Sequence, residues 1–129
     1  IAVACGTGGT LAGIIQGVNE YTQALGISVL KGNFMTKEVS RFLESTNNKT
    51  SVSNNWLVKN EFHHGGYARK TPELLSFIDQ FKEQHSIQLE PIYTGKLFYA
   101  LDQLLAQDYF PINSRVVAIH TGGLQGLNL

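Results

Sequence analysis

Runs of consecutive apolar residues alternate along the chain with stretches in which apolar residues recur every three or four positions. The first pattern is typical of strands buried on both faces of a parallel sheet, and the second of helices with one buried side. The predicted strands are residues 1–5, 27–30, 56–58 and 114–123, where the last strand runs into a glycine-rich turn. The predicted helices are residues 11–24, 36–45, 70–85 and the part of 90–108 that follows a glycine turn. This alternation predicts an α/β fold, with an open, mostly parallel sheet and helices on both faces.

Each predicted helix has apolar side chains that we expect to face the core. They are Leu11, Ile14, Ile15 and Val18; Val39, Phe42 and Leu43; Leu74, Ile78 and Phe81; and Leu97, Leu101, Leu104 and Leu105. Gly26 is a plausible C-cap of the first helix. Thr71 can cap the third helix, and Pro72 suits its first turn. The polar residues 45–55 are expected to form an exposed loop.

Composition narrows the classes of function. The 129 residues are 43% hydrophobic, which suffices for one domain with a core. Basic and acidic side chains number 10 each, so neither nucleic acid nor a membrane surface is an expected partner. The single Cys excludes a disulfide framework and a four-thiolate metal site, and it suits a cytoplasmic location. No apolar run approaches the roughly 20 residues that cross a bilayer.

The first residue is Ile rather than Met, and the first predicted strand starts at once. Chains seldom begin inside a buried strand. We therefore expect a processed product or a piece of a longer protein; the alternative is that a few disordered residues precede Ile1.

A glycine- and threonine-rich turn, Gly6-Thr7-Gly8-Gly9-Thr10, joins the first strand to the first helix. Such a turn exposes backbone N–H groups at a helix N-terminus, where the helix dipole also attracts anions. The two threonines add hydroxyl donors. The turn is therefore a candidate phosphate cradle, although a plain tight turn would have a similar composition.

The type of phosphate ligand can be narrowed further. The Walker pattern is absent, because "TGK" at residues 94–96 has neither the spacing nor the following hydroxyl residue. The dinucleotide fingerprint fits poorly, since Leu11 stands where a third Gly or Ala is needed and Lys31 lies near the expected acidic position. A ligand with a single phosphate group is the better candidate.

Four segments together carry a family resemblance: "ACGTGGTLAGI", "GGYARKTPE", "EPIYTGKLFYAL" and "AIHTGGLQGL". In this order the chain resembles pyridoxal-phosphate enzymes of the tryptophan-synthase-β fold type, specifically the 1-aminocyclopropane-1-carboxylate deaminase and D-cysteine desulfhydrase family. The resemblance implies that residues 1–129 are the C-terminal part of the large, cofactor-binding domain. It also implies pyridoxal 5'-phosphate as cofactor and a small amino acid as substrate.

The resemblance assigns roles to individual residues. Gly6, Thr7, Gly8, Gly9 and Thr10 would hold the cofactor phosphate, in agreement with the helix-terminus argument.

Two tyrosines match active-site positions of the family. Tyr93 would lie near the cofactor and act on the substrate as base or nucleophile, and Tyr67 would be a second active-site tyrosine. Because a phenol has a pKa near 10, Tyr93 would need a neighbouring positive charge or hydrogen-bond donor to act as a base at neutral pH. The structural alternative for each is an ordinary aromatic side chain that rests on the core.

Two threonines are also assigned to the cofactor. The resemblance puts Thr121 beside the pyridine nitrogen, where a hydroxyl donates a hydrogen bond without forcing protonation of the ring. Thr94 stands where deaminases of the family carry Glu. An unprotonated ring is a weaker electron sink, which suits β-elimination more than the opening of a cyclopropane. The sequence therefore favours desulfhydrase-like elimination over deamination.

The family's Schiff-base lysine and its carboxylate-binding residues lie upstream of the glycine turn and have no counterpart here. Lys96 opens a helix and is expected to be a polar residue near the site rather than the imine former. This chain alone should therefore be incompetent, and its expected partners are the missing N-terminal part and a second copy in a homodimer.

The remaining candidates favour structural roles. Cys5 is expected to be a small buried residue, His63 and His64 lack zinc-ligand spacing, and His120 is expected to be a hydrogen-bonded structural residue. We predict no metal. Two alternatives to the enzyme stay open: a Rossmann-like domain that binds a phosphate ligand or nucleotide without covalent chemistry, and a truncated product without function.

Overall fold

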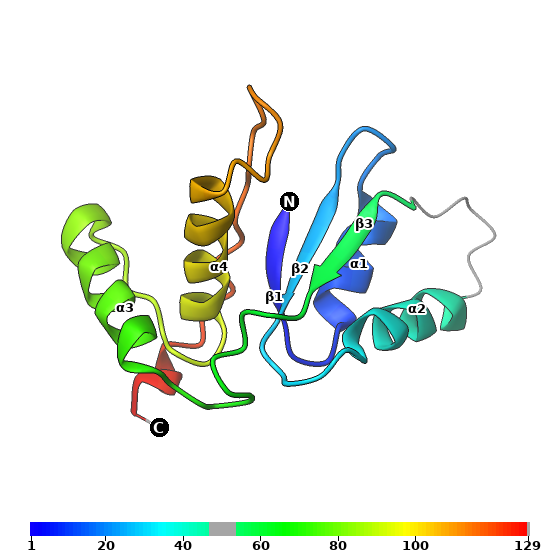
Figure 1. Cartoon of the computed structure of the whole chain (residues 1–129). Coiled ribbons are helices and arrows are strands. Elements are labelled where there is room, and N and C mark those ends of the chain that lie inside the picture. Colours follow the sequence, from blue (N-terminus) through cyan, green and yellow to red (C-terminus); the bar gives the residue numbers. More distant parts are fainter. Residues whose placement is uncertain (47–53, 129) are drawn as a thin grey trace.

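A three-stranded parallel sheet forms the centre of the computed structural model, which describes residues 1–46 and 54–128 (Figure 1). Its strands are β1 (Ala2–Cys5), β2 (Ala24–Ser28) and β3 (Trp56–Lys59), in the order β1-β2-β3. In the register, Val3 lies opposite Gly26, and Gly26 in turn lies opposite Val58. All five residues of β2 are buried, as expected for the central strand of a covered sheet.

Helices cover both faces of the sheet. The helices are α1 (Gly9–Gly17), α2 (Met35–Ser45), α3 (Pro72–His85) and α4 (Thr94–Ala106), followed by a short 3-10 helix, η1 (Leu124–Asn128). Because side chains alternate along a strand, Val3 and Cys5 pack with α1 and α2, whereas Ala2 packs with α4 on the opposite face. Helix α3 packs on the far side of α4, away from the strands (Figure 1). The predicted α/β architecture is confirmed.

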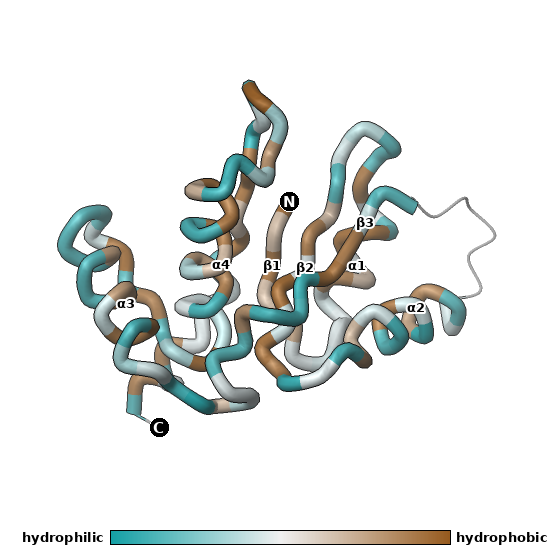
Figure 2. Tube along the Cα trace, viewed as in Figure 1, coloured by the Kyte–Doolittle hydropathy of each residue, from teal (hydrophilic) through white to brown (hydrophobic). Residues whose placement is uncertain are grey.

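The hydrophobic stripes of the helices follow this arrangement, and Figure 2 shows apolar residues gathered along the strands and the adjoining helix sides. Of the residues expected to face the core, Phe42 and Leu105 are exceptions, with 41% and 56% of their surface exposed. Within the described residues, no helix combines the length and the apolarity needed to cross a membrane.

The prediction for Gly26 was wrong. Helix α1 ends at Gly17, and Gly26 lies in the middle of β2, in close contact with the layer above it. A Cβ atom at Gly26 would come within 2.5 Å of Leu11 Cδ2 and 2.7 Å of Cys5 Sγ. The glycine is needed for close packing of α1 on the sheet rather than for ending the helix.

The predicted buried strand at residues 114–123 was also wrong. This segment forms one isolated parallel bridge, Ala2 to Ala118, with hydrogen bonds from Ala2 N to Val117 O and from Ile119 N to Ala2 O. Val117 is 52% exposed, so the segment is not buried on both faces. Among the described residues it pairs only with β1 and only at this one bridge, so no ladder forms and the segment is not a strand.

The start of α3 is as predicted. Thr71 Oγ1 accepts a hydrogen bond from Leu74 N at 3.1 Å, and Pro72 is the first helical residue. Most of the loop expected at residues 45–55 lies outside the described residues.

Candidate functional site

A cavity of about 570 Å³ lies at the carboxyl ends of the strands, where open parallel sheets bind ligands. Five parts of the chain line this cavity: the β1–α1 turn, the residues after β2, the loop before α3, the start of α4 and the C-terminal segment. Its lining residues are Ala4, Gly6, Thr7, Thr10, Leu30, Tyr67, Tyr93, Thr121, Gly122, Gly123 and Gln125. Six predicted site residues, from four separate segments, thus meet at one cavity.

The β1–α1 turn supplies one wall. The first hydrogen bond within α1 runs from Ala12 N to Gly8 O. The backbone amides that precede Ala12 in the helix therefore have no acceptor within α1. No side chain caps this terminus, apart from a long contact of 3.4 Å from Gly9 N to Thr7 Oγ1. The wall therefore has the donor set expected of an anion site.

Gly8 and Gly9 shape the turn instead of lining the cavity. Gly8 has φ 92°, in the left-handed region that side chains disfavour. A Cβ atom there would lie 2.9 Å from Val39 Cγ2, so the turn sits tightly on α2. Gly6, by contrast, lines the cavity and leaves room for Tyr93, whose Cε1 would be 3.0 Å from a Cβ at this position.

The two predicted tyrosines face each other across the cavity. Tyr93 Oη donates a hydrogen bond of 3.3 Å to Tyr67 Oη, and the ring centroids are 6.1 Å apart in an edge-to-face arrangement. The hydrogen bond to Tyr67, with help from burial and from the negative charge of Glu90, raises the pKa of Tyr93 to about 12. These surroundings favour the neutral phenol form of Tyr93.

A buried carboxylate that the sequence analysis missed supports Tyr93. Glu90 is fully buried, and its carboxylate accepts hydrogen bonds from the backbone amides of Ile92, Tyr93 and Thr94 at 2.6, 2.7 and 2.6 Å. Glu90 thereby caps the N-terminus of α4, where negative charge is favoured by the dipole. An acidic residue four positions before a predicted helix was the available signal, but "EPIYTG" reads as an extended piece.

The structure does not bring Thr94 to the cavity, contrary to its predicted contact with the cofactor. Thr94 is fully buried, and its hydroxyl donates to Glu90 Oε1 at 3.2 Å and accepts from Glu90 N at 3.0 Å. As the first residue of α4, it turns inward toward the carboxylate that caps the helix. Thr121 does line the cavity and is exposed.

The other candidate residues are buried or hydrogen-bonded to neighbouring segments. Burial raises the pKa of the Cys5 thiol to about 12, which agrees with a packing role. His64 Nδ1 lies 2.9 Å from Thr71 Oγ1, and His120 Nε2 lies 2.8 Å from Gln88 O. Across the described ranges, no three His, Cys, Asp or Glu side chains are grouped as metal ligands.

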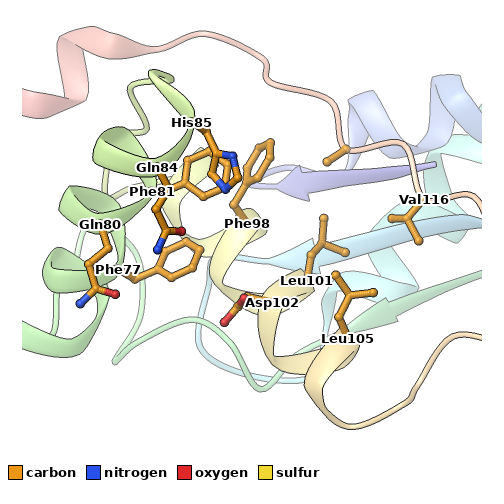
Figure 3. A pocket seen from close by; sticks show the side chains of 11 residues that line it. Phe77, Gln80, Phe81, Gln84, His85, Phe98, Leu101, Asp102, Leu105 and Val116 are labelled. Carbon is orange, nitrogen blue, oxygen red and sulfur yellow. The ribbon is translucent and has the colours of Figure 1, made fainter.

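A second cavity, of about 450 Å³, lies between α3, α4 and the C-terminal segment. Figure 3 shows Phe77 and Phe81 of α3 and Phe98 of α4 in its lining, with the rings of Phe81 and Phe98 close together. It contains none of the predicted site residues, and its lining is mainly aromatic and aliphatic. The first cavity is therefore the candidate site.

Comparison with known proteins identifies the family. A family model described as "Pyridoxal-phosphate dependent enzyme" matches residues 1–122. The chain belongs to the pyridoxal-phosphate-dependent enzymes.

Several members of the pyridoxal-phosphate-dependent enzymes are similar to this chain over nearly its whole length. A Pyrococcus furiosus protein, provisionally named a 1-aminocyclopropane-1-carboxylate deaminase, is 33% identical over 132 residues, which cover 98% of this chain and 40% of that protein. A mitochondrial D-cysteine desulfhydrase/1-aminocyclopropane-1-carboxylate deaminase of Arabidopsis thaliana is 32% identical over 98% of this chain and 33% of its own length.

A solved structure agrees with the fold. The crystal structure of an ACC deaminase homologue superimposes with a TM-score of 0.81 and 32% identity, over 96% of this chain and 39% of that chain. The chain thus spans about 40% of the length of the first of these relatives and of the solved homologue.

The cavity fits one end of the family's cofactor. Gly6, Thr7 and Thr10 line the cavity where α1 begins, no side chain caps this helix, and none of the described residues that line the cavity is acidic. A dianionic phosphate would find donors there and no repelling carboxylate. The residues present therefore fit a phosphate-bearing cofactor at this wall.

Proposed function

We propose that this sequence is the C-terminal part of a pyridoxal-phosphate-dependent deaminase or lyase that acts on a small amino acid. The observation that carries the proposal is a single cavity in which an open helix N-terminus faces a hydrogen-bonded pair of tyrosines. The names of the relatives support the substrate class, since both refer to small amino acids. Residues 1–129 would form part of the large domain.

The β1–α1 turn would hold the cofactor phosphate. The amides that begin α1 and the Thr7 and Thr10 hydroxyls would donate to its oxygens, and the dipole of α1 would favour its charge. When bound, pyridoxal phosphate supplies an electron-withdrawing ring and an aldehyde that can combine with the amino group of a substrate. Thr121 would donate a hydrogen bond to the ring nitrogen from the opposite side of the cavity.

The tyrosine pair would transfer a proton between the substrate and solvent. Tyr93 Oη holds its own proton toward Tyr67 Oη, and Tyr67 is 55% exposed. To accept a proton from the substrate, Tyr93 would pass its own proton to the Tyr67 oxygen while Tyr67 releases its hydroxyl proton to solvent. The raised pKa of Tyr93 makes the neutral form its resting state, so a bound substrate would first meet a proton donor.

The type of reaction follows from Thr121 and from the neighbourhood of Glu90. A hydroxyl beside the ring nitrogen would leave the ring a weak electron sink, which suits elimination from a substrate such as cysteine. Thr94 is buried against Glu90, so a glutamate at this position would put two carboxylates side by side. We therefore propose desulfhydrase-like elimination in preference to the opening of a cyclopropane.

The imine-forming lysine would lie outside this sequence. Lys96 Nζ donates to Gly66 O inside the protein, and Lys96 is not among the residues that line the cavity. The N-terminal part that carries such a lysine would complete the site, in a homodimer in the cytoplasm.

The central test is Tyr93→Phe in the full-length protein, with turnover of D-cysteine, L-cysteine and 1-aminocyclopropane-1-carboxylate measured beside the visible absorption of bound cofactor. We expect loss of most turnover, by about 10²-fold or more, with the cofactor retained. Tyr21→Phe, at a position that is 86% exposed, is the matched control and should keep full activity. Unchanged turnover in Tyr93→Phe would reject the role assigned to this residue.

A binding domain without covalent chemistry is the second candidate. It is favoured by one observation: the phosphate wall is complete within this chain, whereas no lysine is among the described residues that line the cavity. The two candidates differ in a simple measurement. The enzyme in full length takes up pyridoxal phosphate covalently, so borohydride fixes the cofactor to the protein; a binding domain would release all of it on denaturation.

A further inference from the structure

A buried lysine connects the first turn of α4 to the loop that carries Tyr67. The Lys96 side chain is fully buried, and its Nζ donates a hydrogen bond of 2.8 Å to the carbonyl oxygen of Gly66. The two residues are 30 positions apart, so the contact joins separate segments. Burying an ammonium group is costly, and an apolar side chain would fill the same space at lower cost. The contact therefore calls for an explanation beyond packing.

The loop that Lys96 contacts has an unusual backbone. Gly65 and Gly66 have φ values of 102° and 122°, and their neighbours His64 and Ala68 have φ values of 55° and 58°. Residues other than glycine pay a conformational cost in this region. The loop closes two of its own turns, in which Gly66 N donates to His63 O and Arg69 N donates to Gly66 O. Lys96 adds a contact from outside the loop, from α4.

The contact acts directly on the position of Tyr67. The carbonyl of Gly66 and the amide nitrogen of Tyr67 belong to the same planar peptide unit. Arg69 N and Lys96 Nζ both donate to this carbonyl, so the local turn and the contact from α4 together set the orientation of the bond that leads into Tyr67. The Tyr67 side chain is 55% exposed, so packing around it provides little restraint of its own.

Helix α4 also carries the partner of Tyr67. Tyr93 is the N-cap residue of α4, three positions before Lys96, and its hydroxyl lies 3.3 Å from that of Tyr67. We propose that Lys96 is a positioning residue, which fixes the distance between the two tyrosine hydroxyls by tying the Gly66 carbonyl to the start of α4. The proposal rests on the proposed function of the tyrosine pair.

The test is a double-mutant cycle in the full-length protein, with Lys96→Met, Tyr67→Phe and the combination. Lys96→Met should lower kcat about tenfold and leave KM within twofold, because it disturbs the tyrosine pair rather than the contacts that bind substrate. In the Tyr67→Phe background the same substitution should lower kcat less than twofold, since the hydroxyl to be positioned is gone. Equal tenfold losses in both backgrounds would overturn the proposal. Lys82→Met, at an exposed lysine of α3, should be silent.

A second readout does not depend on activity. Tyrosinate absorption at 295 nm, titrated against pH, sums the ionisation of all tyrosines, and the difference from Tyr93→Phe isolates that of Tyr93. The pKa of Tyr93 is raised to about 12 chiefly by its hydrogen bond to Tyr67 and in part by Glu90. Lys96→Met should bring one tyrosine closer to the ordinary value near 10. An unchanged titration curve would overturn the proposal.

These two readouts also separate the inference from the function on which it rests. If Tyr67→Phe and Tyr93→Phe both keep full turnover, the proposed function fails, while the titration still decides whether Lys96 holds the tyrosine pair together. Circular dichroism must show that each variant is folded. Should Lys96→Met not fold, Lys96→Gln takes its place, because it keeps a polar N–H donor on a side chain too short to make the contact.

Discussion

The buried carboxylate of Glu90 gives the sharpest test of the structure. Its oxygens accept three backbone amides at the start of α4, at 2.6 to 2.7 Å. Glu90→Gln keeps the shape of the side chain but replaces one acceptor oxygen by an NH2 group. If the remaining oxygen stays with the amides of Tyr93 and Thr94, the amide of Ile92 faces a donor and loses its partner.

The expected cost can be worked from these contacts. A buried donor without a partner costs about 1–3 kcal/mol. Two further hydrogen bonds lose a charged acceptor, and a hydrogen bond to a charged group contributes about 1 kcal/mol more than a neutral one. Part of this loss is offset, because a buried charge is removed. The site also has little room to relax, since a Cβ at Gly126 would lie 2.8 Å from Glu90 Oε2. We expect a net loss of about 3 kcal/mol.

The measurement is urea unfolding of the chain, followed by circular dichroism at 222 nm, for wild type, Glu90→Gln and Glu83→Gln. Glu83 is an exposed carboxylate of α3, so the same chemical change there should alter the free energy of unfolding by less than about 0.5 kcal/mol. The reasoning is refuted if the two variants lose the same stability. That result would mean that the three amides find other partners at no cost.

Two further predictions concern the core. The pKa of Cys5 is raised from 9.0 to about 12, so from ionisation alone Cys5 should react with a thiol reagent about a thousandfold more slowly at neutral pH than an ordinary thiol. The reaction rate in the folded chain should keep rising with pH beyond 9. A rate that levels off near pH 9 would contradict the burial of Cys5. Gly26→Ala should destabilise the chain by about 1–3 kcal/mol, because the added methyl group overlaps with Leu11 and Cys5. Gly13→Ala, in α1 with open space around it, should stabilise the chain by about 0.5–1 kcal/mol. Thermal unfolding compares the two variants, and equal effects would argue against the packing described.

The sequence predicted those parts of the fold that depend on local patterns. Apolar periodicity located all four α-helices, and Thr71 with Pro72 marked the start of α3, because a cap acts within one turn of the helix. Gly26 was misread for the opposite reason. Its role is set by Leu11 and Cys5, which approach it from other elements, and a single sequence carries no record of such a contact. The segment at 114–123 has the composition of a strand, but it bonds to β1 only around Ala2, and a strand needs a continuous ladder.

For the candidate site too, the sequence predicted the features that depend on local pattern and missed those that depend on contacts between distant segments. The turn at residues 6–10 could be interpreted from its own composition, since glycines before a helix expose amides whatever surrounds them. The tyrosine pair came only through resemblance, because Tyr67 and Tyr93 are 26 positions apart and meet through tertiary structure. Glu90 was missed since its cap forms over an irregular turn rather than at a regular N-cap position. Lys96 was expected near the site, but its link to Gly66 was not foreseeable from spacing.

The two helices that begin beside the cavity differ in how the backbone amides at their N-termini are bonded, and this difference bears on the proposed binding of an anion. Helix α1 begins after Gly8 with no side-chain cap, and Thr10 in its first turn lines the cavity. Helix α4 begins with its amides bound to the buried carboxylate of Glu90, which already supplies the negative charge that a helix terminus attracts. An anionic ligand that entered the cavity would therefore meet donors at α1 and a filled terminus at α4. Under the proposed function, this asymmetry would favour one orientation of the cofactor, with its phosphate toward α1 and the remainder of the molecule toward Tyr93 and Tyr67.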